Sequence, residues 1–315
     1  MEKISLIVPC YNEEEALPTL YQELQRITSQ MQDYDFEILF IDDGSKDKTL
    51  SLLKEMAQED ERVKYISFSR NFGKESAMYA GFCNATGDYV ASLDADMQDP
   101  PALLPQMMKI IKEEGYDSVA TRRVMRKGEP KIRSAFARTF YKIMHRISDV
   151  DIVDGARDFR LMKRAMVDAI VAMCEQDRFS KGIFGWIGFK TYWLPFENVQ
   201  RVAGKTKWSF SKLFKYSIDG ILAFSDAPLK LPKICSILSF IASMGMLSWA
   251  LVRTFVQNKP FMDWQFIISI ILFISSAIFG CMGIMCAYLG KINKEVKNRP
   301  QYVVRETNKE DIVLK

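Results

Sequence analysis

Paired carboxylates are the groups in this 315-residue sequence that are best placed to do chemistry. Asp94 and Asp96 stand two positions apart, directly after the short apolar run 89–93 (YVASL). Two carboxylates at this spacing can share a hard divalent cation such as Mg²⁺ or Mn²⁺. Such an ion keeps positions open for phosphate oxygens and neutralises the charge of a diphosphate. A D-x-D pair is common by chance, so its place at the end of a predicted strand is what favours a metal site.

Other polar residues follow other predicted strands. They are Tyr11, Asn12 and Glu13 after the first strand, and Asp42 and Asp43 after the second. For the run 42–45 (DDGS) taken alone, a helix cap or a solvated turn is the commoner meaning. The two acidic pairs together predict a polar site formed by several strand ends.

Composition excludes several classes of protein. The 43 Lys and Arg residues exceed the 39 Asp and Glu residues by four, which is too small a net charge to indicate nucleic-acid binding. His145 is the single histidine, and this excludes most Ser-His-Asp, Cys-His and multi-histidine metal sites. The six cysteines form no C-x-x-C pair, so we expect free thiols. Any chemistry in this protein therefore depends on carboxylates.

Two phosphate-binding motifs are also absent. The turn after the first strand, PCYNEE, has no glycine, so it is not a G-x-G-x-x-G dinucleotide fingerprint. The run 204–206 (GKT) resembles the end of a P-loop, but Val199 stands where the first glycine of that motif belongs.

Strand and helix patterns alternate along the first part of the chain. The predicted strands are 4–8, 36–41, 63–68, 89–93 and 118–121, and the predicted helices are 13–31, 47–58 and 74–84. This alternation predicts an α/β domain with a Rossmann-like, mostly parallel sheet that helices cover on both faces. Ligands in such sheets bind at the carboxyl ends of the strands, where the acidic pairs fall.

Two uncharged runs, 234–252 and 266–289, are each long enough to cross a bilayer as a helix. The alternative, two core helices of a soluble protein, fits poorly because both runs are apolar on every face. Lys and Arg gather outside the pair rather than between its members, so the positive-inside rule predicts a transmembrane hairpin with both flanks in the cytosol. The expected organisation is a cytosolic domain 1–207, an interfacial segment 208–232, the two spans within 233–290, and a cytosolic tail 291–315.

The segment 122–147 combines many basic residues with apolar residues at helical spacing. We expect a basic amphipathic helix on the membrane surface; a core-packed helix with a solvated face is the alternative. The basic residues expected to meet anionic lipid or guide a lipid phosphate are Arg126, Lys127, Lys131, Arg133 and Arg138. Gly245, Gly280 and Gly283 in the spans allow close helix packing, which leaves self-association open.

Four motifs follow one another along the first part of the chain: VPCYNEE at 8–14, FIDDGSKDKT at 40–49, DADMQDP at 94–100 and RDFRLMKR at 157–164. Together they resemble inverting family-two glycosyltransferases with the GT-A fold. With RVAGKTKWS at 201–209 and the terminal hairpin, the sequence is most similar to the polyprenyl-phosphate glycosyltransferases, a group with bactoprenol glucosyltransferases and dolichyl-phosphate mannose synthases. The resemblance implies an enzyme of the plasma membrane with a cytosolic catalytic domain.

The resemblance also implies roles for individual residues. Those implied to hold the base and ribose of the nucleotide are Pro9, Tyr11, Glu13, Ile41 and Asp43. Those implied to bind the sugar diphosphate are Asp94 and Asp96 through Mg²⁺ or Mn²⁺, Ala95 through its backbone, and Gln98, Arg122, Arg201 and Lys207. Asp158 matches a carboxylate on the acceptor side, and with Asp96 it is the expected catalytic residue. A helix N-cap is the structural alternative for Asp158.

The implied reaction is inverting transfer of a hexose from UDP-glucose to undecaprenyl phosphate, giving a lipid-linked sugar for cell-envelope glycosylation. A phosphate acceptor is already anionic at neutral pH, so no histidine base is needed. Two other functions stay open. A processive polysaccharide synthase shares these motifs but normally has Q-x-x-R-W, which the chain lacks, and an inactive membrane scaffold would keep the nucleotide-sugar fold. The identity of the sugar and of the base cannot be read from the sequence.

Overall fold

The computed structural model describes part of the chain. The described residues are 1–123, 153, 155–196, isolated positions between 232 and 255, and 264–313. The chain divides into two compact units. The first unit contains Met1–Gly220 together with Arg299–Lys315, and the second is Ile221–Asn298. The last residues of the chain therefore belong to the same unit as its N-terminal domain.

The first unit is built on an eight-stranded sheet in the order β7-β5-β6-β4-β1-β2-β3-β8 among the described residues. The strands are β1 (Glu2–Cys10), β2 (Tyr34–Asp42), β3 (Val63–Phe68), β4 (Tyr89–Ser92), β5 (Ser118–Arg123), β6 (Ala156–Lys163), β7 (Thr191–Phe196) and β8 (Val304–Thr307). The central pairs β3-β2-β1-β4 and the pair β5-β7 are parallel, whereas β6 and β8 run antiparallel to their neighbours. The predicted α/β class and mostly parallel sheet are confirmed.

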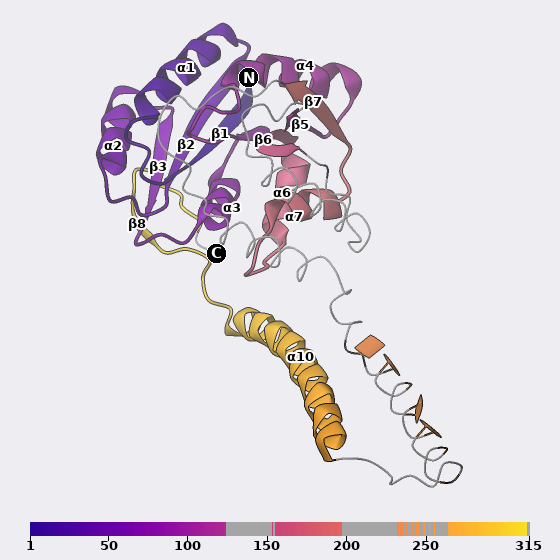
Figure 1. Cartoon of the computed structure of the whole chain (residues 1–315). Helices are drawn as coiled ribbons and strands as arrows, with labels where there is room; N and C mark the ends of the chain where they lie inside the picture. Colours follow the sequence, from indigo (N-terminus) through magenta and orange to yellow (C-terminus); the bar gives the residue numbers. More distant parts are fainter. Residues whose placement is uncertain are drawn as a thin grey trace. The chain divides into compact units, whose positions relative to one another are not determined.

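Helices cover both faces of the sheet, with α1, α2 and α4 on one side and α3, α6 and α7 on the other (Figure 1). They are α1 (Leu17–Gln30), α2 (Thr49–Glu59), α3 (Lys74–Asn84), α4 (Leu104–Glu114), α6 (Arg164–Ala172) and α7 (Ser180–Trp186), and a 3-10 turn precedes α4 at Pro101–Leu103. Ile4 and Leu6 of β1 face the core beneath α1 and α4. Ile7 points the other way, and a Cβ on Gly81 of α3 would lie 2.2 Å from its side chain. Both faces are thus buried, which explains the continuous apolar strands.

Helix α1 starts later than the sequence pattern predicts, at Leu17 instead of Glu13. The carbonyl oxygen of Glu13 accepts hydrogen bonds from the backbone N–H groups of Ala16 and Leu17, which makes 13–16 a turn. Pro18 then falls in the first helical turn, where its missing N–H costs no hydrogen bond. The polar residues after β1 therefore lie in a loop that precedes the helix.

The second unit contains α10 (Trp264–Lys297), which is apolar over most of its length. Its segment Phe273–Lys297, with a mean hydropathy of 1.7, is long and apolar enough to cross a membrane. The predicted span 266–289 lies within α10. Of the predicted span 234–252, only isolated positions are described, and each of these is helical. The rest of that span, residues 124–147 of the basic segment 122–147, and most of the interfacial segment 208–232 lie outside the described residues.

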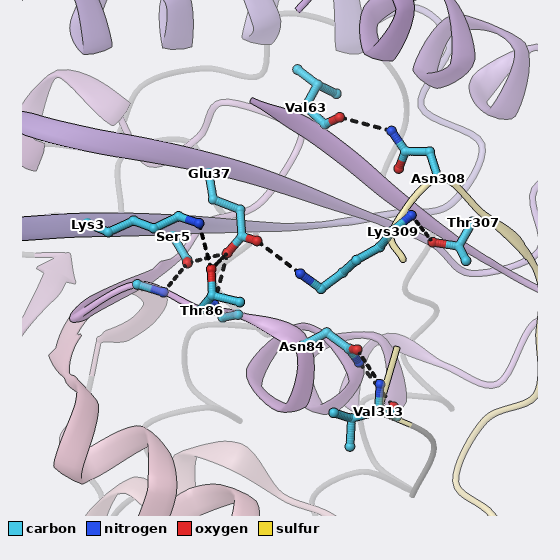
Figure 2. Close-up of polar contacts among 12 residues, drawn as sticks. Lys3, Ser5, Glu37, Val63, Asn84, Thr86, Thr307, Asn308, Lys309 and Val313 are labelled. Carbon is cyan, nitrogen blue, oxygen red and sulfur yellow. Dashed lines mark hydrogen bonds and ion pairs between the residues drawn. The ribbon is translucent and has the colours of Figure 1, made fainter. Parts of the chain in front are cut away.

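The C-terminal segment folds back onto the first unit, which the sequence pattern did not indicate. Strand β8 pairs antiparallel with the edge strand β3. The Asn308 side chain accepts a hydrogen bond from the Tyr65 N–H at 2.8 Å. It donates one to the Val63 carbonyl at 3.1 Å (Figure 2). Further along, the Val313 N–H donates to Asn84 Oδ1 at 2.7 Å. Backbone and side-chain contacts together fix the segment to this edge of the sheet.

A buried ion pair joins the same segment to the middle of the sheet (Figure 2). Lys309 Nζ lies 3.2 Å from Glu37 Oε1, and both side chains are largely buried. Glu37 also accepts hydrogen bonds from the Ser5 hydroxyl at 2.5 Å and the Thr86 N–H at 2.9 Å. Burial raises the pKa of Glu37, but the two hydrogen bonds and the charge of Lys309 more than offset this and hold the pKa below its ordinary value.

We predict that Lys309→Met lowers the free energy of unfolding by about 1–3 kcal/mol, because it leaves a buried carboxylate without one of its partners. Lys54→Met is the matched control, since Lys54 also pairs with this segment, through Glu306 at 2.5 Å, but on the exposed surface. Its effect should be clearly smaller. Thermal or denaturant unfolding of the full chain in detergent measures both, and equal losses in the two variants would contradict the prediction.

Candidate active site

The carboxyl ends of the parallel strands bring together residues from three separate motifs. Strand β1 pairs with β2 on one side and with β4 on the other, so Cys10, Asp42 and Ser92 end at the same edge of the sheet. The Asp43 N–H donates to the Cys10 carbonyl at 2.9 Å. The polar residues expected after these strands therefore lie along one edge.

Asp42 and Asp43 have different surroundings. Asp42 accepts hydrogen bonds from the Ser45 N–H at 3.0 Å and the Ser67 hydroxyl at 2.7 Å, which agrees with a structural turn. Asp43 is 3% exposed and accepts hydrogen bonds from the N–H groups of Phe72 at 2.6 Å and Gly73 at 2.9 Å. Burial raises the pKa of Asp43 to about 6, although these hydrogen bonds oppose the shift. A buried carboxylate that is costly to ionise is a candidate for function.

The loop after β2 packs closely on the loop after β3. Gly44 has a φ of +66°, and a Cβ at this position would lie 2.4 Å from the backbone carbon of Arg70. Only glycine fits such an approach. Residues 69–73 are thereby held beside Asp43.

The residues expected to hold the nucleotide base surround this edge. Pro9 and Ile41 are paired in register, and the Ile41 side chain is fully buried, so only its backbone could face a ligand. Asn12 has a φ of 53°, a left-handed conformation that asparagine tolerates, and its side chain accepts a hydrogen bond from the Lys46 N–H at 2.8 Å. Tyr11 and Glu13 beside it are partly exposed. The part of this loop that a ligand could reach is therefore polar and partly open.

The D-x-D pair occupies a strained turn. Asp94 and Asp96 follow β4. Met97 has a φ of 54°, a left-handed backbone conformation that is strained in most residues other than glycine. The Gln98 N–H donates to Asp96 Oδ1 at 3.2 Å, while the Ala95 side chain is buried. Such strain is commonest at active sites and ligand-binding sites.

Lys74, the first residue of α3, joins two of the predicted site residues. Its ammonium group lies 2.5 Å from Asp94 Oδ1 and also contacts Asp158 Oδ2. Burial would lower the pKa of Lys74, but the two carboxylates outweigh burial and raise the pKa above its ordinary value. The lysine therefore carries a positive charge between two carboxylates that would otherwise repel each other.

Asp158 lies within strand β6, so the helix N-cap interpretation is wrong. Antiparallel pairing of β4 with β6 sets Ser92 opposite Arg160, and the Lys74 ammonium group joins Asp158 to Asp94, two residues beyond the end of β4. The Ser92 hydroxyl fixes the position by donating to the Asp158 carbonyl at 2.7 Å. Burial opposes ionisation of Asp158, but the charges of Lys74 and Lys181 prevail and lower its pKa. Asp158 is thus held as a carboxylate.

A second buried ion pair joins the motifs DADMQDP and RDFRLMKR. Arg157 Nε lies 2.9 Å from Asp99 Oδ1, and its Nη2 donates to Gln98 Oε1 at 3.3 Å. Burial raises the pKa of Asp99 to about 6, whereas the Asp99 charge outweighs burial and raises the pKa of Arg157. The pair fixes the D-x-D turn to the strand that carries Asp158.

Within the described residues, no group of three His, Cys, Asp or Glu side chains forms a preassembled metal site. Asp94 and Asp96 nevertheless supply carboxylate oxygen atoms, the donors that a hard divalent cation prefers, and such an ion would compete with Lys74 for Asp94. Asp94 and Asp96 are the side chains that would hold such an ion.

The remaining predicted residues fall into two groups. Arg122 lies inside β5 and not after it, and its side chain is exposed. The other predicted residues lie outside the described part of the chain; they are Arg126, Lys127, Lys131, Arg133, Arg138, Arg201 and Lys207.

The family model for glycosyl transferase family 2 matches residues 5–171, which contain most of β1, the strands β2 to β6, and the motifs at 8–14, 40–49, 94–100 and 157–164. The chain belongs to this family. It is a glycosyltransferase, and its α/β domain with a mostly parallel sheet is GT-A-like.

Relatives extend the similarity over nearly the whole chain. The prophage-derived bactoprenol glucosyl transferase of Shigella flexneri is 36% identical over 98% of this chain and 99% of its own length. CsbB of Bacillus subtilis, which is named as a glycosyltransferase, is 41% identical over 97% of this chain and 92% of its own. The similarity therefore includes the apolar C-terminal part.

Among solved structures, glucosyl-3-phosphoglycerate synthase of Mycobacterium tuberculosis, in complex with Mn²⁺, UDP-glucose and phosphoglyceric acid, is 16% identical. It matches 70% of this chain and 78% of its own with a TM-score of 0.45. A similarity of this size carries no conclusion about the ligands of the present chain.

Sequence reasoning did not identify Lys74. A signal was present, since the run 70–74 (RNFGK) places a glycine and a lysine between the third predicted strand and the following helix. Its significance becomes visible only when Asp94 and Asp158 are found on either side of the ammonium group.

We predict that Asp43→Asn raises the free energy of unfolding more at pH 7.5 than at pH 5. The raised pKa means that the folded state binds the proton of Asp43 more tightly than the unfolded state, so the cost of ionisation is present above pH 6 and absent below about pH 4. Asp168→Asn, which changes an exposed carboxylate on α6, is the control. An equal change at both pH values would show that Asp43 is ionised without cost.

Proposed function

We propose that this glycosyltransferase moves a hexose from a nucleotide sugar, UDP-glucose in the first instance, to a polyprenyl phosphate such as undecaprenyl phosphate. The transfer inverts the anomeric carbon and takes place on the cytosolic side of a membrane. Support comes from the names of the full-length relatives, which include bactoprenol glucosyl transferases. The observation that carries the proposal is the facing pair Asp94 and Asp158, joined by Lys74 at the strand ends.

On the donor side, the buried Asp43 and the loop 11–13 would hold the base and ribose. Asp94 and Asp96 would hold Mg²⁺ or Mn²⁺, which when bound neutralises charge on the diphosphate leaving group. Lys74 already carries a positive charge at Asp94 and would add to this neutralisation. Arg201 and Lys207 would close on the same diphosphate.

On the acceptor side, the chain would have to position a phosphate rather than deprotonate it. A phosphate monoester has a second pKa near 6 and is already a nucleophilic anion at neutral pH. Asp158 suits an orienting role, because it is fixed by Ser92 and Lys74 at the centre of the site. The basic residues of segment 122–147 would guide the lipid phosphate toward it.

The composition of the first unit supports a membrane hairpin, because it limits how many times the chain can cross the membrane. It contains both Met1–Gly220 and Arg299–Lys315, so the chain leaves this unit and returns to it. A folded domain lies on one side of a membrane, and the intervening chain must therefore cross an even number of times. If α10 is one crossing, a second lies before it, where the run 234–252 is predicted to span.

The proposed reaction is tested with purified protein, undecaprenyl phosphate and a panel of nucleotide sugars. We expect a phosphate-linked hexosyl lipid, identified by mass, with UDP-glucose as the preferred donor and a β-linked product from the α-linked sugar. Asp96→Asn should reduce kcat at least about 100-fold, whereas Asp168→Asn on the exposed face of α6 should leave it unchanged. Wild-type protein that forms no lipid-linked sugar from any donor would refute the proposal, as would full activity with a chelator.

The hairpin is tested by labelling with a membrane-impermeant maleimide in intact bacterial cells that express the protein. Asn258→Cys, between the two predicted spans, should become labelled from outside. Lys315→Cys, at the end of the chain, should be labelled only after the cells are opened. The unsubstituted chain controls for the natural cysteines. External labelling of position 315, or internal labelling of position 258, would contradict the topology.

A further inference from the structure

Arg160 of β6 is a buried cation without an ion-pair partner among the described residues. It is 3% exposed, and its Nη1 donates only to the hydroxyl groups of Ser118 at 3.2 Å and Thr191 at 3.3 Å. Its buried Nε has no hydrogen-bond acceptor in the described part of the chain. The guanidinium group faces the rings of Phe184 at 4.5 Å and Trp193 at 5.3 Å.

Burying such an unpaired charge lowers the stability of the fold. A buried charge needs a counter-charge or full hydrogen bonding, and two aromatic rings compensate for only part of the lost hydration. Burial accordingly lowers the pKa of Arg160 to about 9. Two other arginines nearby have acceptors: the partly buried Arg157 pairs with Asp99, and Arg178, whose pKa burial also lowers, donates to the carbonyls of Met173 and Ile170. Arg160 differs from both in that its buried Nε has no hydrogen-bond acceptor among the described residues.

A cavity of about 200 Å³ lies against this guanidinium group. Arg157, Arg160 and Lys181 line it together with Phe184 and Trp193, and none of its described lining residues is acidic. Because a water molecule occupies about 30 Å³ in the liquid, the cavity has room for a phosphate group. Three basic side chains around a partly open cavity of this size favour an anion over a neutral ligand.

The cavity adjoins the reaction centre. Asp158 and Arg160 are two residues apart on β6 and so share one face of the sheet. Lys181 lies close enough for its charge to act on Asp158. On its other side Asp158 contacts Lys74, which also contacts Asp94. The donor carboxylate and the basic cavity are thus linked through Lys74 and Asp158.

We infer that this cavity binds the phosphate group of the lipid acceptor, with Arg160 and Lys181 as its principal contacts. The inference rests on the proposed function and deepens it. In the transfer, a phosphate oxygen forms the new bond to the anomeric carbon, and the bond from that carbon to the nucleoside diphosphate breaks. The electron pair of the broken bond leaves with the diphosphate, and a dianionic acceptor has no proton to lose.

Steady-state kinetics of Arg160→Gln and Lys181→Met test the assignment. Loss of a charged contact to phosphate should raise the KM for undecaprenyl phosphate at least about tenfold in each variant, with the KM for UDP-glucose unchanged. Lys190→Met is the matched control, because Lys190 lies 4.5 Å from the centre of the Tyr116 ring but does not line the cavity. Its two KM values should equal those of the wild type.

A binding measurement without donor or metal separates the cavity from the reaction. Farnesyl phosphate should raise the melting temperature of the wild type and not of Lys181→Met, while farnesol should do so for neither. Stabilisation by inorganic phosphate alone, with none from farnesyl phosphate, would show a site for free phosphate and overturn the lipid assignment.

Three further outcomes would also be decisive. Unchanged acceptor KM and unchanged farnesyl phosphate binding in Lys181→Met would refute the inference, even if Arg160→Gln fails to fold. A raised KM for UDP-glucose alone would assign the cavity to the donor diphosphate and refute it too. Wild-type protein that binds farnesyl phosphate through Lys181 but transfers no sugar would refute the proposed function and leave the anion site established.

Discussion

The contact of one ammonium group with two carboxylates is the interaction on which the site depends. Asp158 of β6 and Asp94, which follows the neighbouring antiparallel strand β4, both contact the Lys74 ammonium group, and without Lys74 their charges would repel. Lys74 is held in turn by the loop before it, because the N–H groups of Phe72 and Gly73 donate to the buried Asp43. The expected nucleotide end of the site and its reaction centre are therefore one connected hydrogen-bonded structure.

The C-terminal segment supports that same loop. Tyr302 stacks on Phe68 with ring centres 4.9 Å apart, Phe68 contacts the edge of Phe72, and the Val303 carbonyl accepts the Ser69 N–H at 2.9 Å. These residues follow shortly after Lys297, where the apolar helix α10 ends. The chain that leaves the first unit thus returns to it beside the loop that positions Lys74.

Much of the fold could be predicted because the spacing of apolar residues within a short segment already indicates whether that segment is a strand or a helix. Runs such as 36–41 and 63–68 are apolar on both faces, and helical patterns between them leave a parallel sheet as the consistent arrangement. The exceptions are segments whose structure is set by contacts that the sequence pattern of the segment does not show. Helix α1 begins after a turn fixed by Glu13, and β8 forms only because the edge of β3 is available to it. A four-residue strand among polar residues has no pattern of its own.

The sequence by itself determined the α/β class, the acidic pair at the end of the fourth strand, the exclusion of most histidine-based sites, and the motifs of family 2. Only the tertiary structure decided that Asp158 lies in a strand facing Asp94, that Lys74 joins them, and that Arg160 is buried beside a basic cavity. Sequence patterns report which residues are buried or follow a strand. Charge pairing depends on distances of a few ångströms between residues that are 20 to 84 positions apart in the chain, because only strand register and helix packing set those distances.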